Sequence, residues 1–232
     1  DTRGRQMKDG LTARRAALIA ILALAWVSAP AGAGTWAQPT QLAAMTLTNL
    51  PANNASVAVG PNGEAVAVWI NEANYAVQYA TQSAAGAWSA GKTLYSASVT
   101  NGETTTSARV AIGPDGAATV VFGSTTPGKL QYCVAGGRVV RCLGPSTSYA
   151  KTATLASGAA AWTRAANLSA KGIAVEATRI GLDAAGNAIA TWSQVDTAGA
   201  PTVLQSATRP AGAAWSAPQV LHGTGAAIAN AV

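Results

Sequence analysis

Residues 57–69, Val-Ala-Val-Gly-Pro-Asn-Gly-Glu-Ala-Val-Ala-Val-Trp, decide the fold class because the chain carries the same pattern three times. The second copy occupies residues 110–122 and the third residues 180–192. In each copy a turn joins two apolar runs, and the second run ends on an aromatic residue. Each turn has a glycine that supplies the positive φ of a tight hairpin: Gly63, Gly116 and Gly186. Each copy is therefore predicted to be a β-hairpin.

Two further segments extend each hairpin to four strands. The predicted third strands share a glutamine in second place, at residues 77–81, 130–134 and 204–208. The predicted fourth strands share a leading tryptophan, at residues 36–42, 88–94, 162–168 and 215–221. The unit that repeats is therefore a four-stranded one.

The second repeat is longer than the other two. Gln78 and Trp88 are 10 residues apart, whereas Gln131 and Trp162 are 31 apart. This difference predicts an insertion at residues 134–158, between the third and fourth strands of the second repeat.

Four strands in about 50 residues are typical of a β-propeller blade. We therefore predict an all-β protein, a β-propeller of four-stranded antiparallel blades, and expect this chain to be an incomplete N-terminal part of a ring of about 6 to 7 blades. The predicted divisions are a fourth strand of a closing blade at 34–42, blades at 43–95, 96–169 and 170–222, and the start of another blade at 223–232. The alternative is a string of immunoglobulin-like sandwiches, but these need about 100 residues each and nothing repeats at that length.

Residues 1–33 have the pattern of a signal peptide. Five basic residues precede the uncharged run 16–27, which is too short to span a bilayer, since about 20 residues are needed. Ala31-Gly32-Ala33 supplies the small residues of a cleavage site, so we expect a secreted, extracellular protein. Arg14-Arg15 leaves open a twin-arginine leader, and retention as an anchor is the other alternative.

Charge and cysteine content restrict the partners. The chain has a net charge of +6, but residues 34–232 hold 10 basic and 7 acidic residues without basic runs. We therefore expect no nucleic acid partner and, once the leader is removed, no membrane partner.

Export favours a disulfide between Cys133 and Cys142, with free buried thiols as the alternative. Two cysteines without neighbouring ligands exclude a zinc site, and we expect no metal and no cofactor.

The segments leading into the tryptophans resemble the Asp-box, or BNR, repeat of sialidase-like β-propellers, written Ser/Thr-x-Asp-x-Gly-x-Thr-Trp. Residues 208–221 are the nearest copy, although Pro210 stands in the place of the aspartate, and Ser83 stands there in the first repeat. The resemblance implies a fold and no activity, because Asp-boxes lie away from the catalytic face of that family. The arginine triad, Tyr–Glu pair and acid/base Asp expected of an active sialidase are not recognisable in this sequence.

Arg109 and Arg179 are the candidate ligand-binding residues. Both stand just before a predicted first strand, in a column with Ser56 and Ala231, and first strands line the channel of a propeller. Two arginines there could bind an anionic ligand through paired hydrogen bonds. The alternative is that they are solvent-facing or lie between blades.

Other notable side chains are assigned structural roles. The recurring aromatics are predicted to pack the blades: Trp69, Phe122 and Trp192. His222, the single histidine, is expected at the surface, because no nucleophile can be tied to it. Hydrogen bonding within turns is expected to account for three carboxylates: Glu64, Asp115 and Asp183.

The functional hypothesis is a secreted bacterial β-propeller that serves as a binding or scaffold module for glycans or a cell-surface partner. The alternative is a sialidase-like glycoside hydrolase whose catalytic residues lie mainly in C-terminal blades beyond this sequence. Whether the protein is an enzyme is uncertain from the sequence, and these residues favour binding over catalysis.

Overall fold

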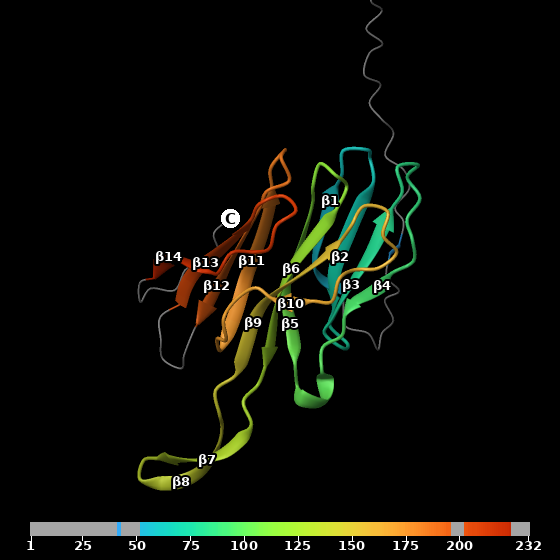
Figure 1. Ribbon diagram of the computed structural model, residues 1–232. Helices are drawn as coiled ribbons and strands as arrows, with labels where there is room; N and C mark the ends of the chain where they lie inside the picture. The colour runs from blue at the N-terminus through green and yellow to red at the C-terminus, as the bar shows by residue number, and fades with distance from the viewer. Residues whose placement is uncertain (1–40, 43–51, 196–201, 224–232) are drawn as a thin grey trace, which may run out of the picture. The chain divides into compact units, whose positions relative to one another are not determined.

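The computed structural model of the chain describes residues 41–42, 52–195 and 202–223 (Figure 1). The fold of this part is all-β, as predicted, and is built of four-stranded antiparallel sheets. The predicted signal peptide and the predicted start of a further blade at 224–232 lie outside the described residues. Gln41 and Leu42, the described end of the predicted strand 34–42, are not in a strand.

Each of the three sheets is a meander in which successive strands pair antiparallel. The first sheet contains β1 (Ala52–Val59), β2 (Ala65–Asn71), β3 (Ala76–Gln82) and β4 (Lys92–Tyr95). After a 3₁₀ turn, η1 (Val99–Asn101), the second contains β5 (Thr104–Ile112), β6 (Ala118–Thr126), β9 (Thr147–Leu155) and β10 (Ala166–Asn167). The third contains β11 (Ala174–Leu182), β12 (Ala188–Val195), β13 (Thr202–Arg209) and β14 (Gln219–Gly223). A separate hairpin is formed by β7 (Leu130–Ala135) and β8 (Arg138–Leu143).

The three predicted hairpin turns are present at equivalent places. Their glycines have φ values of 82°, 77° and 84° at Gly63, Gly116 and Gly186. Aspartates cap two of the turns, since Asp115 Oδ1 accepts from the amide of Ala117 and Asp183 Oδ1 from that of Ala185. The local sequence therefore determines these turns.

The predicted insertion in the second repeat was wrongly placed. β6 pairs with β9, which sets Lys151 opposite Phe122, so the third strand of this sheet is Thr147–Leu155 and not residues 130–134. The inserted segment is the β7–β8 hairpin, which lies between the second and third strands. The misassignment arose because residues 130–132 reproduce the Leu-Gln-Tyr start of a third strand, whereas β9 carries Lys151 where the other repeats carry glutamine. Burial accounts for this pairing: β9 buries Ala150 and Ala153 against its neighbours, whereas every residue of β7 except Cys133 is exposed.

The fourth strands also differ from the prediction. Trp88 forms only an isolated bridge to Gln82, and β4 begins at Lys92. Trp162 and Trp215 likewise precede their strands, β10 and β14. The tryptophans therefore belong to the turns that lead into the fourth strands.

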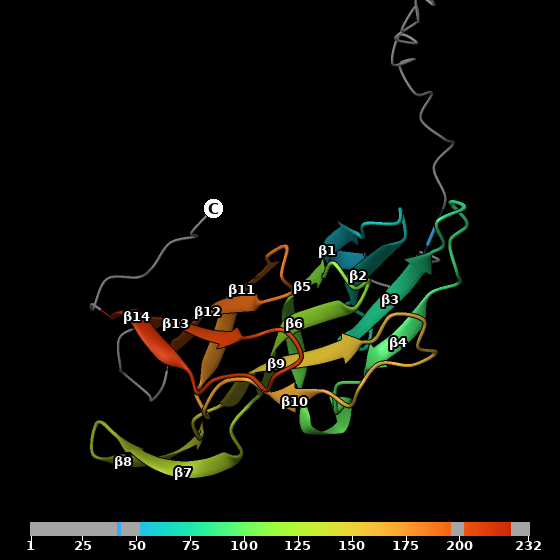
Figure 2. The ribbon, with the colours of Figure 1, turned by 45° about the horizontal axis from the view of Figure 1, so that its top comes forward.

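The sheets stack through their first strands, with β5 packed against both β1 and β11 (Figure 2). The aromatic column fills the interior as predicted, with Trp69 4% exposed and Phe122 and Trp192 fully buried. Small residues permit this close stacking: a Cβ on Gly123 would lie 2.9 Å from the carbonyl oxygen of Val175. Side chains also cross between sheets, as where Thr106 Oγ1 donates to that carbonyl at 3.0 Å.

Candidate functional site

Each first strand contains a β-bulge at the same place. The register shifts between Asn53 and Ser56 in β1, between Thr106 and Arg109 in β5, and between Glu176 and Arg179 in β11. Two residues of the first strand therefore lie opposite one aromatic residue of the second strand. Such bulges bend a strand and re-aim the side chains that follow.

The first residue of each bulge is a non-glycine with positive φ: Asn54 at 53°, Ser107 at 52° and Ala177 at 51°. This conformation costs about 1 kcal/mol or more for such residues, and it persists only where the surroundings impose it. Its recurrence in three sheets makes the bulge a property of the repeat.

Hydrogen bonds join the bulges of neighbouring sheets. The amide of Ala177 donates to Ser107 Oγ at 3.1 Å, and Thr178 Oγ1 donates to the carbonyl of Ser107. The amide of Val110 donates to Ser56 Oγ at 3.3 Å. The three bulges therefore form one continuous, hydrogen-bonded strip across β11, β5 and β1.

Arg109 and Arg179 both occupy the position that follows a bulge, in the same column as Ser56. Arg109 Nη1 donates to the carbonyl of Ala108 at 2.8 Å and to that of Asn54, in the neighbouring sheet, at 3.4 Å. Arg179 Nη1 donates to the carbonyl of Thr178 at 3.0 Å. Each guanidinium is thus fixed through one nitrogen to the backbone of a bulge.

The two arginines are close enough to repel each other. Burial lowers the pKa of the half-buried Arg109, and the positive charge of Arg179 lowers that pKa further. An arginine nonetheless stays protonated in a protein. Within residues 41–42, 52–195 and 202–223, no carboxylate forms an ion pair with either arginine. The strip therefore presents two adjacent positive charges that the described residues leave unneutralised.

The first strands run into the three hairpin turns, and these turns line one groove. The groove has a volume of about 320 Å³ and is bounded by residues 59–61, 112–114 and 182–184. Its carboxylate, Asp183, is already engaged: hydrogen bonds from the side chain and backbone of Asn187 lower its pKa. Asp183 is therefore a turn residue, and the cationic groups of the strip lie elsewhere, at the bulges.

A second polar cluster, which sequence reasoning missed, joins the first two sheets. Tyr95 Oη donates to Glu103 Oε1 at 2.6 Å, Ser124 Oγ donates to the same oxygen, and the amide of Ser98 donates to Oε2 at 2.7 Å. Lys151 Nζ lies 5.6 Å from the centre of the Tyr95 ring. The four side chains come from β4, β6, β9 and the residue before β5, so only the folded chain brings them together.

The electrostatics of this cluster favour a structural role. We call it the clamp, because Glu103 and its hydrogen-bond partners Tyr95, Ser98 and Ser124 hold the first two sheets together. Burial alone would raise the pKa of Glu103, but hydrogen bonds from Ser124, Tyr95 and Ser98 and the charge of Lys151 outweigh it and lower the pKa. Burial and the bond to Glu103 raise the pKa of Tyr95 to about 12. The phenol therefore stays neutral at physiological pH.

The Tyr95–Glu103 pair does not share a site with the arginine strip. Arg109 lies six residues beyond Glu103 along β5, which is about 20 Å in an extended strand. This separation gives no basis for combining the Tyr–Glu pair with the two arginines into one catalytic centre.

Comparisons with known proteins add no identity. No family model matches the chain, and a search of the curated proteins finds no match. The resemblance to Asp-box repeats therefore stays a prediction.

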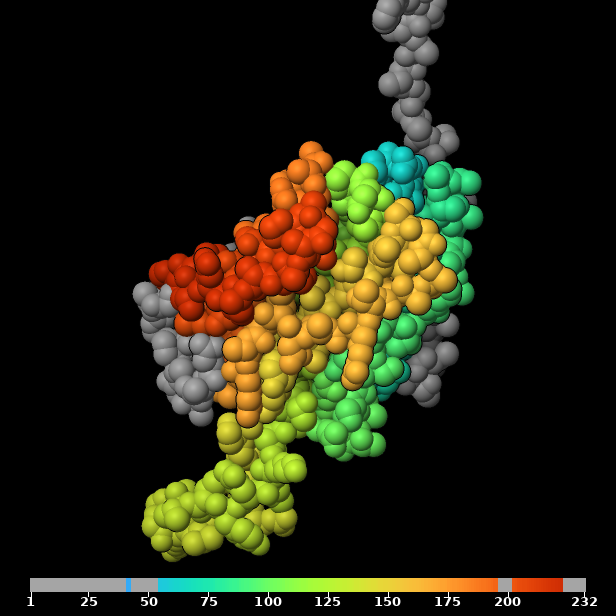
Figure 3. Space-filling model, in the orientation of Figure 1, coloured from blue at the N-terminus to red at the C-terminus, as the bar shows by residue number. Residues whose placement is uncertain are grey.

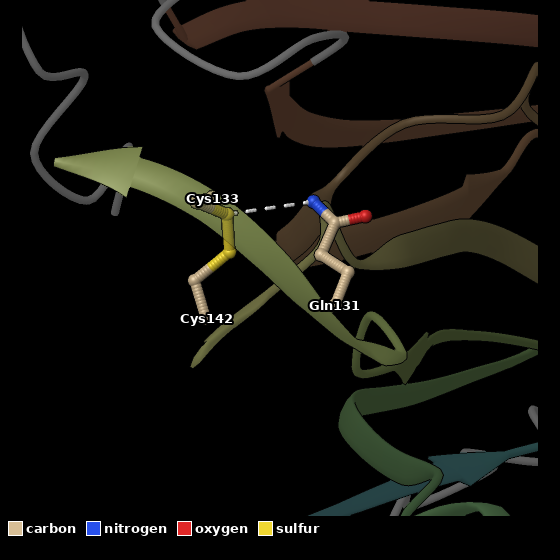
Figure 4. Close-up of a disulfide and its surroundings, with 3 residues drawn as sticks. All are labelled: Gln131, Cys133 and Cys142. Carbon is tan, nitrogen blue, oxygen red and sulfur yellow. Dashed lines mark hydrogen bonds between the residues drawn. A yellow bond between two sulfur atoms is a disulfide. The ribbon is translucent and has the colours of Figure 1, made fainter. Parts of the chain in front are cut away.

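The remaining predicted residues lie apart from the strip. Cys133 and Cys142 form the predicted disulfide, with Cα atoms 6.0 Å apart, and Gln131 Nε2 lies 3.8 Å from Cys133 Sγ (Figure 4). His222 is an exposed residue of β14. In the described part of the chain, no group of three or more His, Cys, Asp or Glu side chains could hold a metal ion. Nor does that part contain a helix long and apolar enough to cross a membrane.

Proposed function

We propose that this chain is an exported binding module of β-propeller type, in which the bulged strip of the first strands binds an acidic glycan. Arg109 and Arg179 supply the cationic contacts to a carboxylate of the ligand. Catalysis is not part of the proposal.

The observation that carries the proposal is the juxtaposition of two guanidinium groups without an acidic partner among the described residues. Like charges on neighbouring strands repel each other, and an anion bound between them would relieve that repulsion. Each guanidinium uses one nitrogen to hold the backbone, which leaves N–H groups for paired hydrogen bonds to a carboxylate. Because that anchoring fixes the side chains beforehand, less entropy is lost on binding.

The packing of the sheets supports the propeller architecture. Three meanders stack through their first strands, as successive blades of a propeller do. The third sheet has an apolar groove of about 450 Å³ lined by Leu182, Ile189 and Pro210, among other residues. Ile189 is 48% exposed there. A face of this kind is suited to packing against a further blade.

The proposal is tested by calorimetric titration of the purified chain with oligogalacturonate, an acidic glycan, and with a neutral glucan oligomer of the same length. We expect binding of the acidic oligomer alone. The double variant Arg109→Gln/Arg179→Gln should lose at least about 100-fold in affinity, because two charge-assisted hydrogen bonds contribute about 1.5 kcal/mol each or more.

A matched control removes the same charge elsewhere. Arg164 and Lys171 are exposed and lie outside the strip, so Arg164→Gln/Lys171→Gln should bind like the parent chain. Equal affinity for the acidic and neutral oligomers, or equal losses in the two double variants, would show that the strip is not the binding site.

A further inference from the structure

The β7–β8 hairpin carries six exposed large apolar side chains. Figure 1 and Figure 3 show it extending beyond the three sheets. Its large apolar side chains would be expected inside a protein, yet Tyr132 is 76% exposed, Val134 75% and Val139 71%. Leu130 and Leu143 are more than half exposed as well.

Apolar groups project from both faces of this hairpin. Three directly paired positions share one face, and all but one of their side chains are apolar or aromatic: Leu130–Leu143, Tyr132–Arg141 and Val134–Val139. The opposite face carries Val140, Ala135 and the disulfide together with the polar Gln131 and Arg138. Apolar side chains therefore lie on both faces of the hairpin, which differs from the single flat face that a protein partner would cover.

The hairpin is built to hold its shape away from the sheets. Gly136 and Gly137, both with positive φ, form a two-residue turn at its tip. The disulfide cross-links its strands, since an isolated two-stranded hairpin is only marginally stable. At the base of the hairpin, the segment that leads into it and the segment that leaves it run close together, so that a Cβ on Gly128 would overlap the backbone of Gly144.

All the charged side chains of the hairpin are positive. Between residues 127 and 146 the chain has three cations and no Asp or Glu: Lys129, Arg138 and Arg141. These residues are dispersed along the sequence, but the hairpin pairs its strands and gathers them on one narrow projection. A second copy of the chain would bring like charges together, so self-association through this surface is disfavoured.

We propose that the β7–β8 hairpin docks on an anionic lipid surface, which revises the expectation from the sequence that the chain without its leader has no membrane partner. Apolar side chains on both faces of the hairpin suit the boundary between lipid headgroups and acyl chains, which can surround an inserted segment. Lys129, Arg138 and Arg141 contact the lipid phosphates, and the aromatic Tyr132 lies at the depth that such rings prefer. The lipid-docking site uses none of the residues of the arginine strip, so glycan binding by the strip and lipid docking by the hairpin are tested independently.

The test measures co-sedimentation of the exported, processed chain with vesicles. Vesicles of phosphatidylglycerol mixed with phosphatidylcholine should bind the chain, vesicles of phosphatidylcholine alone should bind it weakly, and added salt should weaken binding. Arg138→Gln/Arg141→Gln should reduce the partition coefficient about 30-fold, at about 1 kcal/mol for each cation near the surface. Arg164→Gln/Lys171→Gln, which removes the same charge outside the hairpin, should leave it unchanged.

A second variant separates lipid docking from simple charge attraction. Tyr132→Ser/Val134→Ser keeps every cation but should weaken vesicle binding by about tenfold or more, because it removes two apolar side chains from the lipid. It should not change binding to soluble polyglutamate. The proposal is overturned if the chain binds neutral and anionic vesicles equally or binds neither. It is also overturned by a second pair of results: polyglutamate binds the hairpin as tightly as anionic vesicles do, and Tyr132→Ser/Val134→Ser changes neither the binding of polyglutamate nor that of vesicles. These results would assign the surface to an acidic protein.

Discussion

Replacement of Glu103 by alanine tests the clamp between the first two sheets. The Glu103 carboxylate accepts from Tyr95 Oη at 2.6 Å, from the Ser98 amide at 2.7 Å and from Ser124 Oγ. Three hydrogen bonds to a charged group would contribute well over 3 kcal/mol, but Glu103→Ala also removes the cost of burying the carboxylate. We therefore expect a net loss of about 3 kcal/mol in the free energy of unfolding, which lowers Tm by about 6–12 °C in a chain of this size.

Glu103→Gln provides the conservative comparison. The two hydroxyls of Tyr95 and Ser124 can rotate to accept from the amide nitrogen, whereas the Ser98 amide still needs the oxygen. We therefore expect Glu103→Gln to recover more than half of the stability that Glu103→Ala loses. A Tm for Glu103→Ala within about 2 °C of the parent value would refute the clamp.

The acid dependence of stability gives an independent check on the same carboxylate. Because the folded-state pKa of Glu103 lies below its ordinary value of 4.5, the unfolded chain binds more protons in acid than the native chain does. The stability that this group contributes is complete above 4.5 and is lost as the pH falls through the lower folded-state pKa. Thermal melts followed by circular dichroism should show a steeper acid loss in the parent than in Glu103→Gln. Parallel declines of the two proteins would contradict the assignment.

Three further predictions concern stability elsewhere. Trp192→Ala empties a fully buried position between the second and third sheets and should cost about 3–5 kcal/mol in chemical denaturation; a loss below about 1 kcal/mol would contradict the packing. Ala177→Gly relieves a positive φ of 51° and should raise the free energy of unfolding by about 0.5–1 kcal/mol, whereas a decrease would show that this backbone is not strained. Cys133→Ser/Cys142→Ser should speed proteolysis within residues 127–146 and leave Tm within about 2 °C, because the hairpin stands apart from the three sheets; a large fall in Tm would show that the two unfold together.

The sequence predicted the parts of the fold that local chemistry determines. The turn glycines required positive φ, the aromatic column required a buried place, and both are found where the repeats put them. The third strand of the second sheet was misplaced, because residues 130–132 look locally like a third strand and β9 does not. Strand pairing depends on burial against the neighbouring sheet, which local similarity does not reveal.

The candidate site was only partly predictable. The repeat alignment placed Arg109 and Arg179 in one column, but the bulges that position them leave no sequence signal, since Ser107 and Ala177 are not residues expected at positive φ. The Glu103 cluster was missed because its members come from four segments. The cations of the β7–β8 hairpin were judged dispersed, because their distance along the chain hides their proximity across the strands.

The proposed glycan site requires that neighbouring first strands place Arg109 and Arg179 so that one anion contacts both. A crystal structure of the chain with bound galacturonate oligomer tests this most directly. We predict a carboxylate within hydrogen-bonding distance of both guanidinium groups, above the bulges of β5 and β11. A saccharide bound elsewhere with the two arginines pointing apart would contradict it.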